Sequence, residues 1–452
     1  MPMNRRAALR GLAATTALVV SSCSDHADAP SSDLVPPLSD DRQLTSELFP
    51  LGVQAGSMRL ESVILWSYST HKGQHWFAVW PEDSDPLSSA QVHEVESHDG
   101  YLKRLIEGLT PNTRYNYGAF TDSDQWSPLG RFQTTFEPDY LGPILVGATS
   151  CTASGRAPFP SLSLLAEQPL DLFCHLGDMS YNDGAETLED FRAGWRRTLS
   201  LPEYQSLLSS VGTYQTWDDH EITDDEKLEL LPPEAVRHGK RAYFEATPTA
   251  SNPSGSLWMS YRWGRSAEFF ILDCRQERDP ELERYISSAQ MAWLKSALAE
   301  SPCHFKVILN SVPIAHLPEI WLTERDRWQG YPEQRDELLD FLIDTPIKNT
   351  WFLSGDFHFG ALWRVEASGP RSHLWEVLCG PGGSAPSKRH TLATSSPELY
   401  TLFFDPEQVS YASGEWAATT ILFDPINDRV TLTFISSETG EVAYQEVISG
   451  DS

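Results

Sequence analysis

The sequence predicts an α/β protein that begins with an all-β segment. From about residue 48 to 136, short runs rich in β-branched and aromatic residues alternate with turn residues, which is typical of a β-sandwich. From about residue 144 onward, strand-like apolar runs alternate with helical patterns, which indicates a layered α/β domain. Polar motifs follow several of these apolar runs, at the positions where open α/β sheets bind ligands.

The composition is that of a globular protein with an acidic surface. With 452 residues, of which 40% are hydrophobic, the chain is long enough for two domains. Its formal net charge of −29 argues against binding to nucleic acids or anionic membranes, so we expect no nucleic-acid-binding domain. An anionic substrate would therefore need a local positive centre, which bound metal cations can supply.

Residues 1–23 have the pattern of a signal peptide. Arg5 and Arg6 precede a short apolar run at residues 11–20, which is too short to cross a bilayer as a mature helix. The twin arginine resembles a Tat signal, a route that exports folded proteins. The sequence therefore predicts an exported protein of the cell envelope.

The end of this segment resembles a lipobox. Residues 20–23 are Val-Ser-Ser-Cys, so Cys23 would become the lipidated first residue; a plain signal peptide with an incidental cysteine is the alternative. Residues 24–44 are rich in Ser, Asp and Pro and predict a flexible tether. We expect membrane contact only through this lipid anchor, or else a periplasmic or extracellular protein.

The remaining cysteines are odd in number, since five of the six lie beyond the lipobox. At least one is therefore unpaired in an exported protein. Cys174 and Cys274 fall within or just after predicted buried strands, which favours packed thiols. Cys151 opens a loop after a strand, which suits a thiolate ligand. A disulfide between Cys303 and Cys379 is possible, although nothing in their spacing favours it.

The first predicted domain, residues 45–137, has strands at 62–66 and 75–80. Residues 109–115, Leu-Thr-Pro-Asn-Thr-Arg-Tyr, resemble the L-x-P-x-T-x-Y signature of fibronectin type III sandwiches. Residues 130–134 fit the last strand of such a sandwich. We therefore predict a fibronectin III-like β-sandwich here.

The second predicted domain, residues 144–448, combines strands with three helical patterns. These helices are expected at residues 189–197, 288–298 and 334–341, and a closing antiparallel hairpin at 419–423 and 430–434. Residues 386–412 show no clear period and are long enough to cover an active site.

Five polar motifs mark this second domain, and four of them follow directly on a short apolar run. They are Ser150-Cys151, residues 177–181 (Gly-Asp-Met-Ser-Tyr), residues 217–221 (Trp-Asp-Asp-His-Glu), Asn310 and residues 355–358 (Gly-Asp-Phe-His). Short apolar runs of this length predict buried parallel strands. We therefore expect the side chains of these motifs to converge on one edge of one sheet, as in a multinuclear metal site.

The donor types in these motifs suit metal ions. Asp178 can bridge two ions, and Tyr181, three residues further on, can bind one of them across a turn. Phenolate and thiolate donors favour Fe³⁺ over Mg²⁺ or Zn²⁺. A turn or helix cap would explain Asp178 by itself, and surface polarity would explain Asp356 and His358, so the chemistry depends on the whole set.

Residues 218–221 are hard to explain without metals. Four consecutive ionisable residues after an apolar run would be costly to bury unpaired. They make sense if cations compensate them, with Asp219 as a ligand and His220 reaching the substrate. A solvated run of charges is the alternative.

Taken together, these residues resemble the calcineurin-like metallophosphoesterase superfamily and, within it, the alkaline phosphatase D (PhoD) family. The resemblance covers roughly residues 46–445 and also includes residues 49–56, 63–66 and Leu-Asp-Cys-Arg at 272–275. It implies a metallophosphatase α/β/β/α domain after the sandwich. Where the wider superfamily has Asp-x-His, Gly-Asn-His and Gly-His-x-His, this chain has residues 150–152, 218–220 and 355–358 in the PhoD form.

The resemblance implies a binuclear site with Fe³⁺ and a divalent ion, expected to be Ca²⁺, while Zn²⁺ or Mn²⁺ can substitute. The implied ligands of Fe³⁺ are Cys151, Asp178, Tyr181, His358 and Asp356 or its neighbours. Asp178 would bridge to the divalent ion, which Asp219 and Asn310 complete, with Asp356 shared or adjacent. The substrate-binding candidates are Arg275 and Asp218. For Arg275, a role as an oxyanion clamp and a salt bridge with Asp273 are equally good explanations.

The implied activity is that of an exported, metal-dependent phosphatase acting on small phosphate monoesters, diesters or both. A hydroxide held by the metals would attack phosphorus in line, and His220 would protonate the leaving oxygen. A purple acid phosphatase-like enzyme is one alternative, since residues 177–183 also resemble that branch, although Cys151 and Asp356 count against it. A surface binding protein without activity is another. We expect a monomer.

Overall fold

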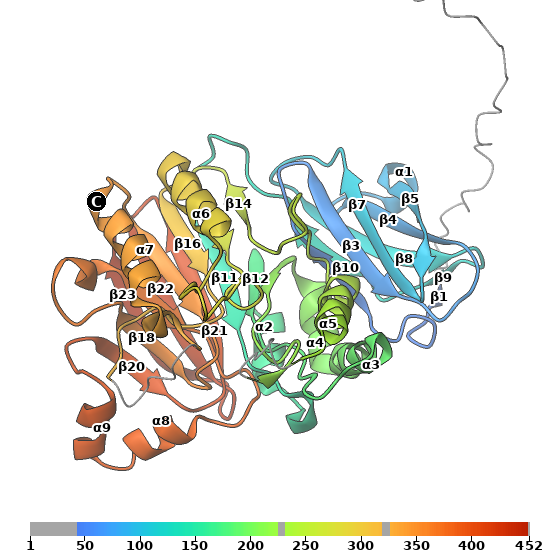
Figure 1. Cartoon of the computed structure of the whole chain (residues 1–452). Coiled ribbons are helices and arrows are strands. Elements are labelled where there is room, and N and C mark those ends of the chain that lie inside the picture. Colours follow the sequence, from blue (N-terminus) through green and yellow to red (C-terminus); the bar gives the residue numbers. More distant parts are fainter. Residues whose placement is uncertain (1–42, 225–230, 319–325, 451–452) are drawn as a thin grey trace, which may run out of the picture. The chain divides into compact units, whose positions relative to one another are not determined.

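Along the strands of the second half, successive side chains alternate between two hydrophobic cores, and this alternation defines the layers of the fold. The computed structural model describes residues 43–224, 231–318 and 326–450. In β15 (Ala267–Ile271), Phe269 and Ile271 lie in the large central core, whereas Phe270 lies in a second core. That second core includes side chains of α6 (Ser288–Glu300) and α7 (Pro332–Asp344), which cover this face of the sheet in Figure 1. The period of two is that of a strand buried on both faces.

Within the described ranges the strands form three sheets. The seven-stranded sheet has the order β14 (Met259–Trp263), β15, β16 (Phe305–Leu309), β17 (Thr350–Ser354), β19 (Trp375–Leu378), β18 (Gly360–Arg364) and β20 (Val409–Ser413). The ten-stranded sheet has the order β23 (Val442–Ser449), β22 (Arg429–Ser436), β21 (Ala417–Asp424), β11 (Ile144–Thr149), β12 (Leu172–Leu176), β13 (Thr213–Thr216), β2 (Val53–Gly56), β3 (Ser62–Tyr68), β7 (Tyr101–Glu107) and β6 (Ser97–His98).

These two sheets pack face to face through the central core. The ring of Phe423 on β21 lies 5.3 Å from the ring of Phe305 on β16 and 6.3 Å from that of Trp351 on β17. On the other side, α2 (Pro160–Ala166) contacts β21 and α4 (Pro202–Ser210) contacts β2. The result is the helix–sheet–sheet–helix layering implied by the resemblance.

The third sheet completes a β-sandwich at the N-terminal side, drawn in blue in Figure 1. It contains β1 (Gln43–Leu44), β9 (Gln125–Trp126), β8 (Arg114–Thr121), β4 (His75–Pro81) and β5 (Gln91–Val95), with β10 (Gly130–Gln133) paired to β8. The Tyr115 hydroxyl, from the L-x-P-x-T-x-Y signature, accepts a hydrogen bond from the Thr110 N–H at 2.8 Å. This tyrosine therefore ties the strand entry to the preceding turn.

The sandwich and the second predicted domain share one sheet. Strand β2 pairs in parallel with β13 through Gly56 and Thr213, so the sandwich strands continue the ten-stranded sheet. The predicted boundaries at 45–137 and 144–448 stay predictions, since this sheet passes through both segments. Gln43 and Leu44, which we assigned to the flexible tether, instead form β1 against β9. The rest of the tether and the signal peptide lie outside the described residues.

The other helices include α3 (Leu188–Leu199), α5 (Pro233–Ala246), α8 (Lys388–Ala393), α9 (Pro397–Phe403), the short α1 (Pro86–Ser89), and 3-10 turns at Ser154–Arg156, Trp328–Gly330 and Pro370–His373. Thr187 begins α3 with a capping box in which its side chain and that of Asp190 each accept a backbone N–H. In the described part of the chain, no helix has the length and apolar character needed to cross a bilayer.

The three predicted helices and the closing hairpin are confirmed as α3, α6, α7 and β21–β22. Residues 386–412, where we found no period, form α8, α9 and most of β20. All five cysteines within the described ranges are free and buried, so the possible Cys303–Cys379 disulfide is not formed. The thiol of Cys303 instead donates to the Gly264 carbonyl.

Candidate metal centre

The predicted ligands begin immediately after strands, but these strands belong to two sheets. Motifs around Cys151, Asp178 and Asp219 follow the parallel strands β11, β12 and β13 of one sheet. Asn310 and Asp356 follow the parallel strands β16 and β17 of the other. The expectation of one edge of one sheet was therefore wrong: the motifs meet because the edges of two packed sheets meet.

Close backbone packing at Gly355 shows how the two edges are joined. A Cβ at this position would lie 2.7 Å from the Ser150 Cβ and 2.8 Å from the Leu176 carbonyl oxygen, atoms that belong to the ends of the opposite sheet. Only glycine fits such an approach. Gly177 is similarly close to Asp218, with a hypothetical Cβ at 2.4 Å from the Asp218 Cβ.

Four predicted ligands adopt left-handed backbone conformations. The φ angles are 56° at Cys151, 59° at Asp178, 68° at Asp356 and 56° at His358. Non-glycine residues rarely adopt positive φ, and each such residue costs about 1–3 kcal/mol. Four of them in one cluster indicate that the turns after β11, β12 and β17 are held for function, at the expense of local stability.

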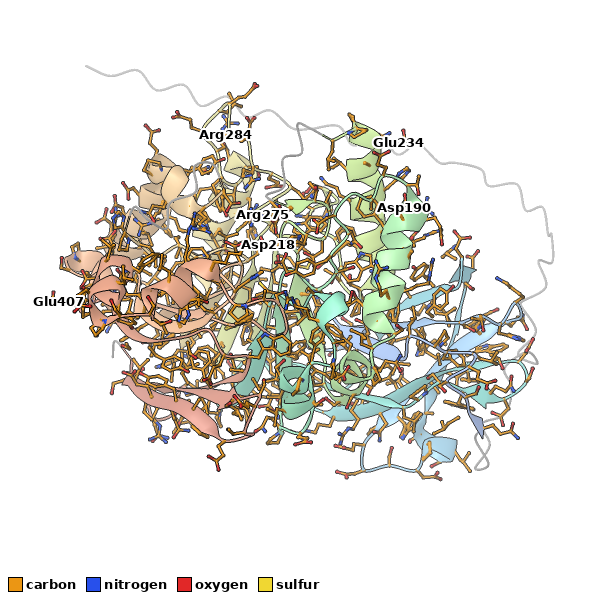
Figure 2. All side chains as sticks on the ribbon, turned by 90° about the horizontal axis from the view of Figure 1, so that it is seen from below. Asp190, Asp218, Glu234, Arg275, Arg284 and Glu407 are labelled. Atoms are coloured by element: carbon orange, nitrogen blue, oxygen red, sulfur yellow. The ribbon has the colours of Figure 1, made fainter. Side chains whose placement is uncertain are left out.

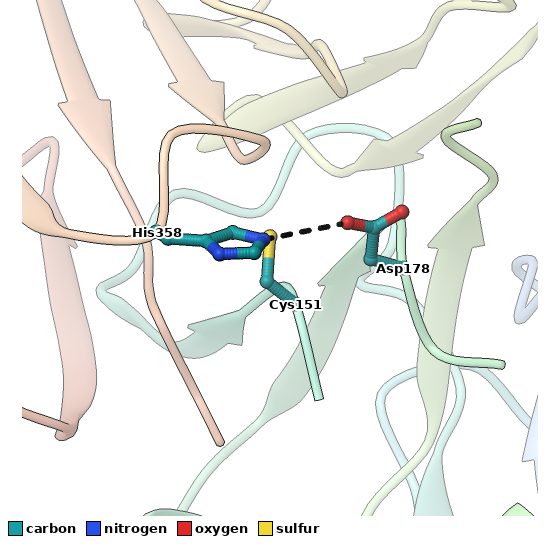
Figure 3. Close-up of side chains that lie close together, drawn as sticks. All are labelled: Cys151, Asp178 and His358. Carbon is teal, nitrogen blue, oxygen red and sulfur yellow. Dashed lines mark ion pairs between the residues drawn. The ribbon is translucent and has the colours of Figure 1, made fainter. Parts of the chain in front are cut away.

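The first ligand group joins three of these turns. The Cys151 Sγ, an Asp178 carboxylate oxygen and a His358 ring nitrogen all lie within 4.8 Å of one another. Figure 3 shows the three side chains converging, with the His358 Nε2 4.0 Å from the Asp178 Oδ2. The Tyr181 hydroxyl donates to the same Asp178 oxygen at 3.2 Å and lies 3.5 Å from the His358 Nε2. Sulfur, carboxylate, phenol and imidazole are thus brought together as the sequence analysis expected.

A second group shares Asp178 with the first. Ligand atoms of Asp178, Asp219 and His220 lie within 4.8 Å of one another. Asn310, which follows β16 of the other sheet, is fully buried; its Oδ1 accepts from the Trp328 Nε1 at 3.1 Å and from the Cys274 Sγ at 2.9 Å. Its Nδ2 has no hydrogen-bond partner.

The cluster concentrates negative charge where water is scarce. Burial raises the pKa of Asp178 and of Asp218 well above their ordinary values, and it raises the pKa of Asp356 to about 6. Burial also raises the pKa of the Cys151 thiol, with Asp178 adding to the effect. One oxygen each of Asp218 and Asp356 has no hydrogen-bond partner. Buried acids without enough compensation are what bound cations would neutralise, so this donor set fits metal ions.

Glu221 acts as a backbone clamp between two motif loops. Its carboxylate accepts the backbone N–H groups of Asp178 at 3.0 Å, Met179 at 2.6 Å and Asp218 at 2.8 Å. In the sequence, Glu221 is evident only as part of a charged run. Its role required knowing that the turns after β12 and β13 are adjacent.

Arg275 and Asp218, the predicted substrate-binding pair, form a fully buried ion pair, and Figure 2 labels them side by side within the fold. A second guanidinium nitrogen, Nη1, binds Asp326. The third, Nη2, has no hydrogen-bond partner and lies 4.0 Å from Asp219 and 3.9 Å from Asp356. This guanidinium is thus a fixed positive charge behind two predicted ligands, with no solvent-exposed surface for a substrate.

The alternative salt bridge between the side chains of Arg275 and Asp273 is not what the described contacts show. Asp273 accepts the Trp217 Nε1–H at 2.8 Å and the backbone N–H of Arg275 at 3.2 Å. Asp273 therefore orders the turn that carries Arg275, while the guanidinium reaches toward the metal centre.

His220 is held by a carboxylate that sequence analysis did not single out. Its Nδ1 lies 2.9 Å from both oxygens of Asp183, and its ring stacks on Tyr181 with centroids 4.1 Å apart. Burial by itself would lower the pKa of His220, but Asp178, Asp183 and Asp219 outweigh it and raise the pKa to about 11. Asp183 lies only two residues beyond Tyr181, so extending the motif at residues 177–181 by two positions would have identified it from the sequence.

Three further residues that contact the site come from segments without a recognisable motif. The Ser384 Oγ lies 2.6 Å from the Tyr181 hydroxyl, and the Ala385 carbonyl accepts from the His358 Nδ1 at 2.9 Å. Arg327 stacks over the Phe357 ring at 3.9 Å and lies 3.4 Å from Asp356. Partners of this kind orient ligands and fix the tautomer of a ligating histidine.

Comparison with known families agrees with this geometry. The family model described as "PhoD-like phosphatase" matches residues 145–417, and the one described as "PhoD-like phosphatase, N-terminal domain" matches residues 35–136. Alkaline phosphatase D of Bacillus subtilis (strain 168) is 25% identical over an alignment of 379 residues, and the match covers 71% of this chain and 63% of that protein. The chain therefore spans less than two thirds of that relative's length.

Two solved structures show the same fold. A structure of PhoD has a TM-score of 0.75 at 19% identity and covers 90% of each chain. Purple acid phosphatase PPD1 from yellow lupin (Lupinus luteus) seeds has a TM-score of 0.64 at 12% identity, covering 88% of this chain and 74% of that one.

Proposed function

The chain belongs to the PhoD-like phosphatase family, and from this premise we propose that it is a metal-dependent phosphatase that hydrolyses phosphate monoesters, diesters or both. The observation that carries the proposal is the meeting of the Cys151, Asp178 and His358 ligand atoms within 4.8 Å, with Tyr181 bonded to Asp178. Burial opposes ionisation of these carboxylates and of the thiol, and bound cations would offset this cost. The same cations would attract the negative charge of a phosphate ester.

The residues divide between two ions. Cys151, Asp178, Tyr181 and His358 would hold Fe³⁺, since thiolate and phenolate favour it. The oxygen donors Asp178, Asp219, Asp356 and Asn310 would hold a hard divalent ion such as Ca²⁺; Asn310 would do so by exchanging Trp328 as the partner of its amide oxygen. When bound, the ions supply a nucleophile at neutral pH and neutralise charge on the phosphate oxygens.

Two side chains of the protein have roles besides metal binding: His220 would supply a proton to the leaving oxygen, and Arg275 positions three carboxylates. Asp183 contacts the His220 Nδ1, and the His220 Nε2, 3.6 Å from the exposed Asp224 carboxylate, would protonate the leaving oxygen. Arg275 keeps Asp218, Asp219 and Asp356 in place through its buried guanidinium and is a positioning residue. The substrate-binding role considered for Arg275 and Asp218 is thereby replaced by an indirect one.

Metal analysis of protein purified from its native host, together with assays on p-nitrophenyl phosphate and bis-p-nitrophenyl phosphate, tests the proposal. We expect iron and at least one calcium per chain, and hydrolysis of one or both esters that stops on chelation and returns when the ions are restored. Full activity in metal-free protein, or no hydrolysis of either ester by the metal-loaded protein, would refute the proposal.

A purple acid phosphatase-like enzyme is the second candidate. The contact between Tyr181 and Asp178 and the similarity in fold to the lupin enzyme favour it. The presence of Cys151 in the same ligand group counts against it. An acidic pH optimum would support this candidate over an alkaline phosphatase.

Cys151→Ala is expected to lose iron and the visible absorption that arises from charge transfer between phenolate and iron. The thiol is fully buried and supplies the sulfur of this ligand group. Metal analysis and absorbance measure the loss, and circular dichroism checks the fold. Cys303→Ala is the matched control, because Cys303 is a buried thiol bonded to Gly264. Retention of iron in Cys151→Ala would contradict the assignment.

We also propose that the protein is exported and anchored to the cell envelope through Cys23, on the basis of the twin arginine and the lipobox-like run. Lipidation should move the native-host protein into the detergent phase, and Cys23→Ala should move it to the aqueous phase. If wild type and Cys23→Ala both partition into the aqueous phase, the protein is a cleaved, soluble form.

A further inference from the structure

Three buried polar side chains next to the metal centre have no role in the proposed reaction: Thr152, His175 and Tyr204. They come from the turn after β11, from β12 and from α4. None of the three is more than 1% exposed, so a substrate does not reach them. Thr152 directly follows the predicted ligand Cys151 in the chain. Any contribution of these side chains to the metal centre must therefore act through the turns that they contact.

Hydrogen bonds connect the three side chains to one another and to the backbone of Asp178. The Thr152 Oγ1 is hydrogen-bonded to the Tyr204 hydroxyl, which lies 2.9 Å from the His175 Nε2. The Thr152 hydroxyl donates to the Asp178 carbonyl at 3.4 Å, and the Thr152 N–H donates to the same oxygen at 3.0 Å. This network of Thr152, Tyr204 and His175 thus ends on the residue that belongs to both ligand groups.

The direction of the hydrogen bonds follows from the number of protons. Thr152 donates its one hydroxyl proton to the Asp178 carbonyl, so it accepts from Tyr204, and Tyr204 in turn accepts from the His175 Nε2. Burial lowers the pKa of His175 to about 3, so its neutral ring has a single proton, which this direction assigns to Nε2. Hydrogen bonds in such a directed series strengthen one another.

No member of the network is charged. Burial raises the pKa of Tyr204 above its ordinary value, so the phenol keeps its proton, and His175 is neutral. The carboxylates of the metal centre, in contrast, repel one another until cations neutralise them. A neutral network can keep its hydrogen bonds in the metal-free and in the metal-bound protein alike.

The turns that the network contacts need such support. Cys151 and Asp178 have φ angles of 56° and 59°, and positive φ at a non-glycine residue persists only where the surrounding structure holds it. The Cys151 N–H donates to the Gly177 carbonyl at 3.2 Å, which joins the two turns through their backbones. The network adds a second attachment, from the Asp178 carbonyl to side chains on β12 and α4.

We propose that Thr152, Tyr204 and His175 are positioning residues that hold the Cys151 and Asp178 turns in their ligand geometry before iron binds. Ligands that are already in place do not have to be ordered by the ion, so the affinity for the ion is higher. This inference rests on the metal centre of the proposed function.

Tyr204→Phe tests the proposal, because it removes one hydroxyl group from the middle of the network and keeps the ring. We expect iron to bind about 10–100-fold more weakly, which is the usual effect of losing a residue that orients metal ligands. Titration of the metal-loaded protein with a competing iron chelator, followed by the visible absorbance, measures the affinity.

Tyr214→Phe is the matched control. Its hydroxyl is equally buried, donates to the Met58 carbonyl at 2.9 Å and accepts from the Trp263 Nε1 at 3.0 Å, and neither partner is a predicted ligand. Tyr214→Phe therefore loses the same number of hydrogen bonds in the core. We expect it to lower the melting temperature as Tyr204→Phe does, but to bind iron as tightly as wild type.

Two substitutions of Thr152 keep the test decisive if Tyr204→Phe does not fold. Thr152→Val removes the hydroxyl and should weaken iron binding, whereas Thr152→Ser keeps the hydroxyl and should bind iron as wild type does. The proposal fails if Tyr204→Phe and Thr152→Val both bind iron as tightly as wild type, or if Tyr214→Phe weakens binding to the same extent. Wild-type protein that binds no iron would instead refute the proposed metal centre, and the inference with it.

Discussion

Asp178→Asn is expected to remove both metal ions and to lower kcat/KM by more than about 10⁴-fold, because the metal centre supplies most of the rate enhancement of such an enzyme. Asp178 belongs to both ligand groups, and no other residue within the described ranges does. An amide cannot bridge two cations as a carboxylate does, so both sites lose a charged ligand at once. Metal analysis and assays with p-nitrophenyl phosphate measure the two effects.

Asp171→Asn is the matched control for this substitution. Asp171 lies just before β12, at the opposite end of the strand from Asp178, and accepts the Leu145 N–H at 2.9 Å, which an asparagine oxygen can also do. We expect Asp171→Asn to keep its metals and its activity. Normal metal content in Asp178→Asn would show that Asp178 is not the bridging ligand.

His220→Asn is expected to lower the rate by about 10²–10⁴-fold for alkyl phosphates while leaving metal content unchanged. Alkoxide leaving groups need a proton, whereas p-nitrophenolate needs little protonation, so the loss should be much smaller for p-nitrophenyl phosphate. A comparison of kcat for both substrates, together with metal analysis, measures this difference.

This test distinguishes a general acid from a metal ligand. The distinction is needed because His220 also lies within 4.8 Å of Asp178 and Asp219, a distance compatible with metal binding. If His220 is a ligand, His220→Asn will lose metal as Asp178→Asn does. If its penalty is the same for both leaving groups, it does not act as the general acid. Asp183→Asn, which removes the negative charge beside the His220 Nδ1, should show a weaker version of the same dependence on the leaving group.

Much of the fold could be predicted from local patterns. The apolar runs at 305–309 and 351–353 are buried strands in which neighbouring residues serve two different cores. The period of the residues at 288–298 is that of α6, and a serine cap at Ser287 begins it. Such patterns are local because a strand or helix must place its apolar side chains at a fixed repeat.

Several features of the site were not accessible in this way. Whether β11–β13 and β15–β17 form one sheet or two depends on pairing between distant segments. A run of apolar residues does not specify which other strand it pairs with. Gly355 packs against Ser150, which lies 205 positions earlier in the chain (355 − 150). Ser384 is a polar residue in a loop, and nothing in its immediate surroundings separates it from other loop residues.

The sequence by itself determined which chemistry the protein can carry out: a thiol, a phenol, carboxylates and imidazoles placed directly after strands, in an order that resembles one family of phosphatases. This was possible because strand ends and donor types are both local properties. The tertiary structure decided how these residues act. It buried Arg275 behind the ligands, turned the Asn310 oxygen toward Trp328, and set Asp183 against His220. These outcomes depend on how two sheets pack against each other, which no single segment of the chain specifies.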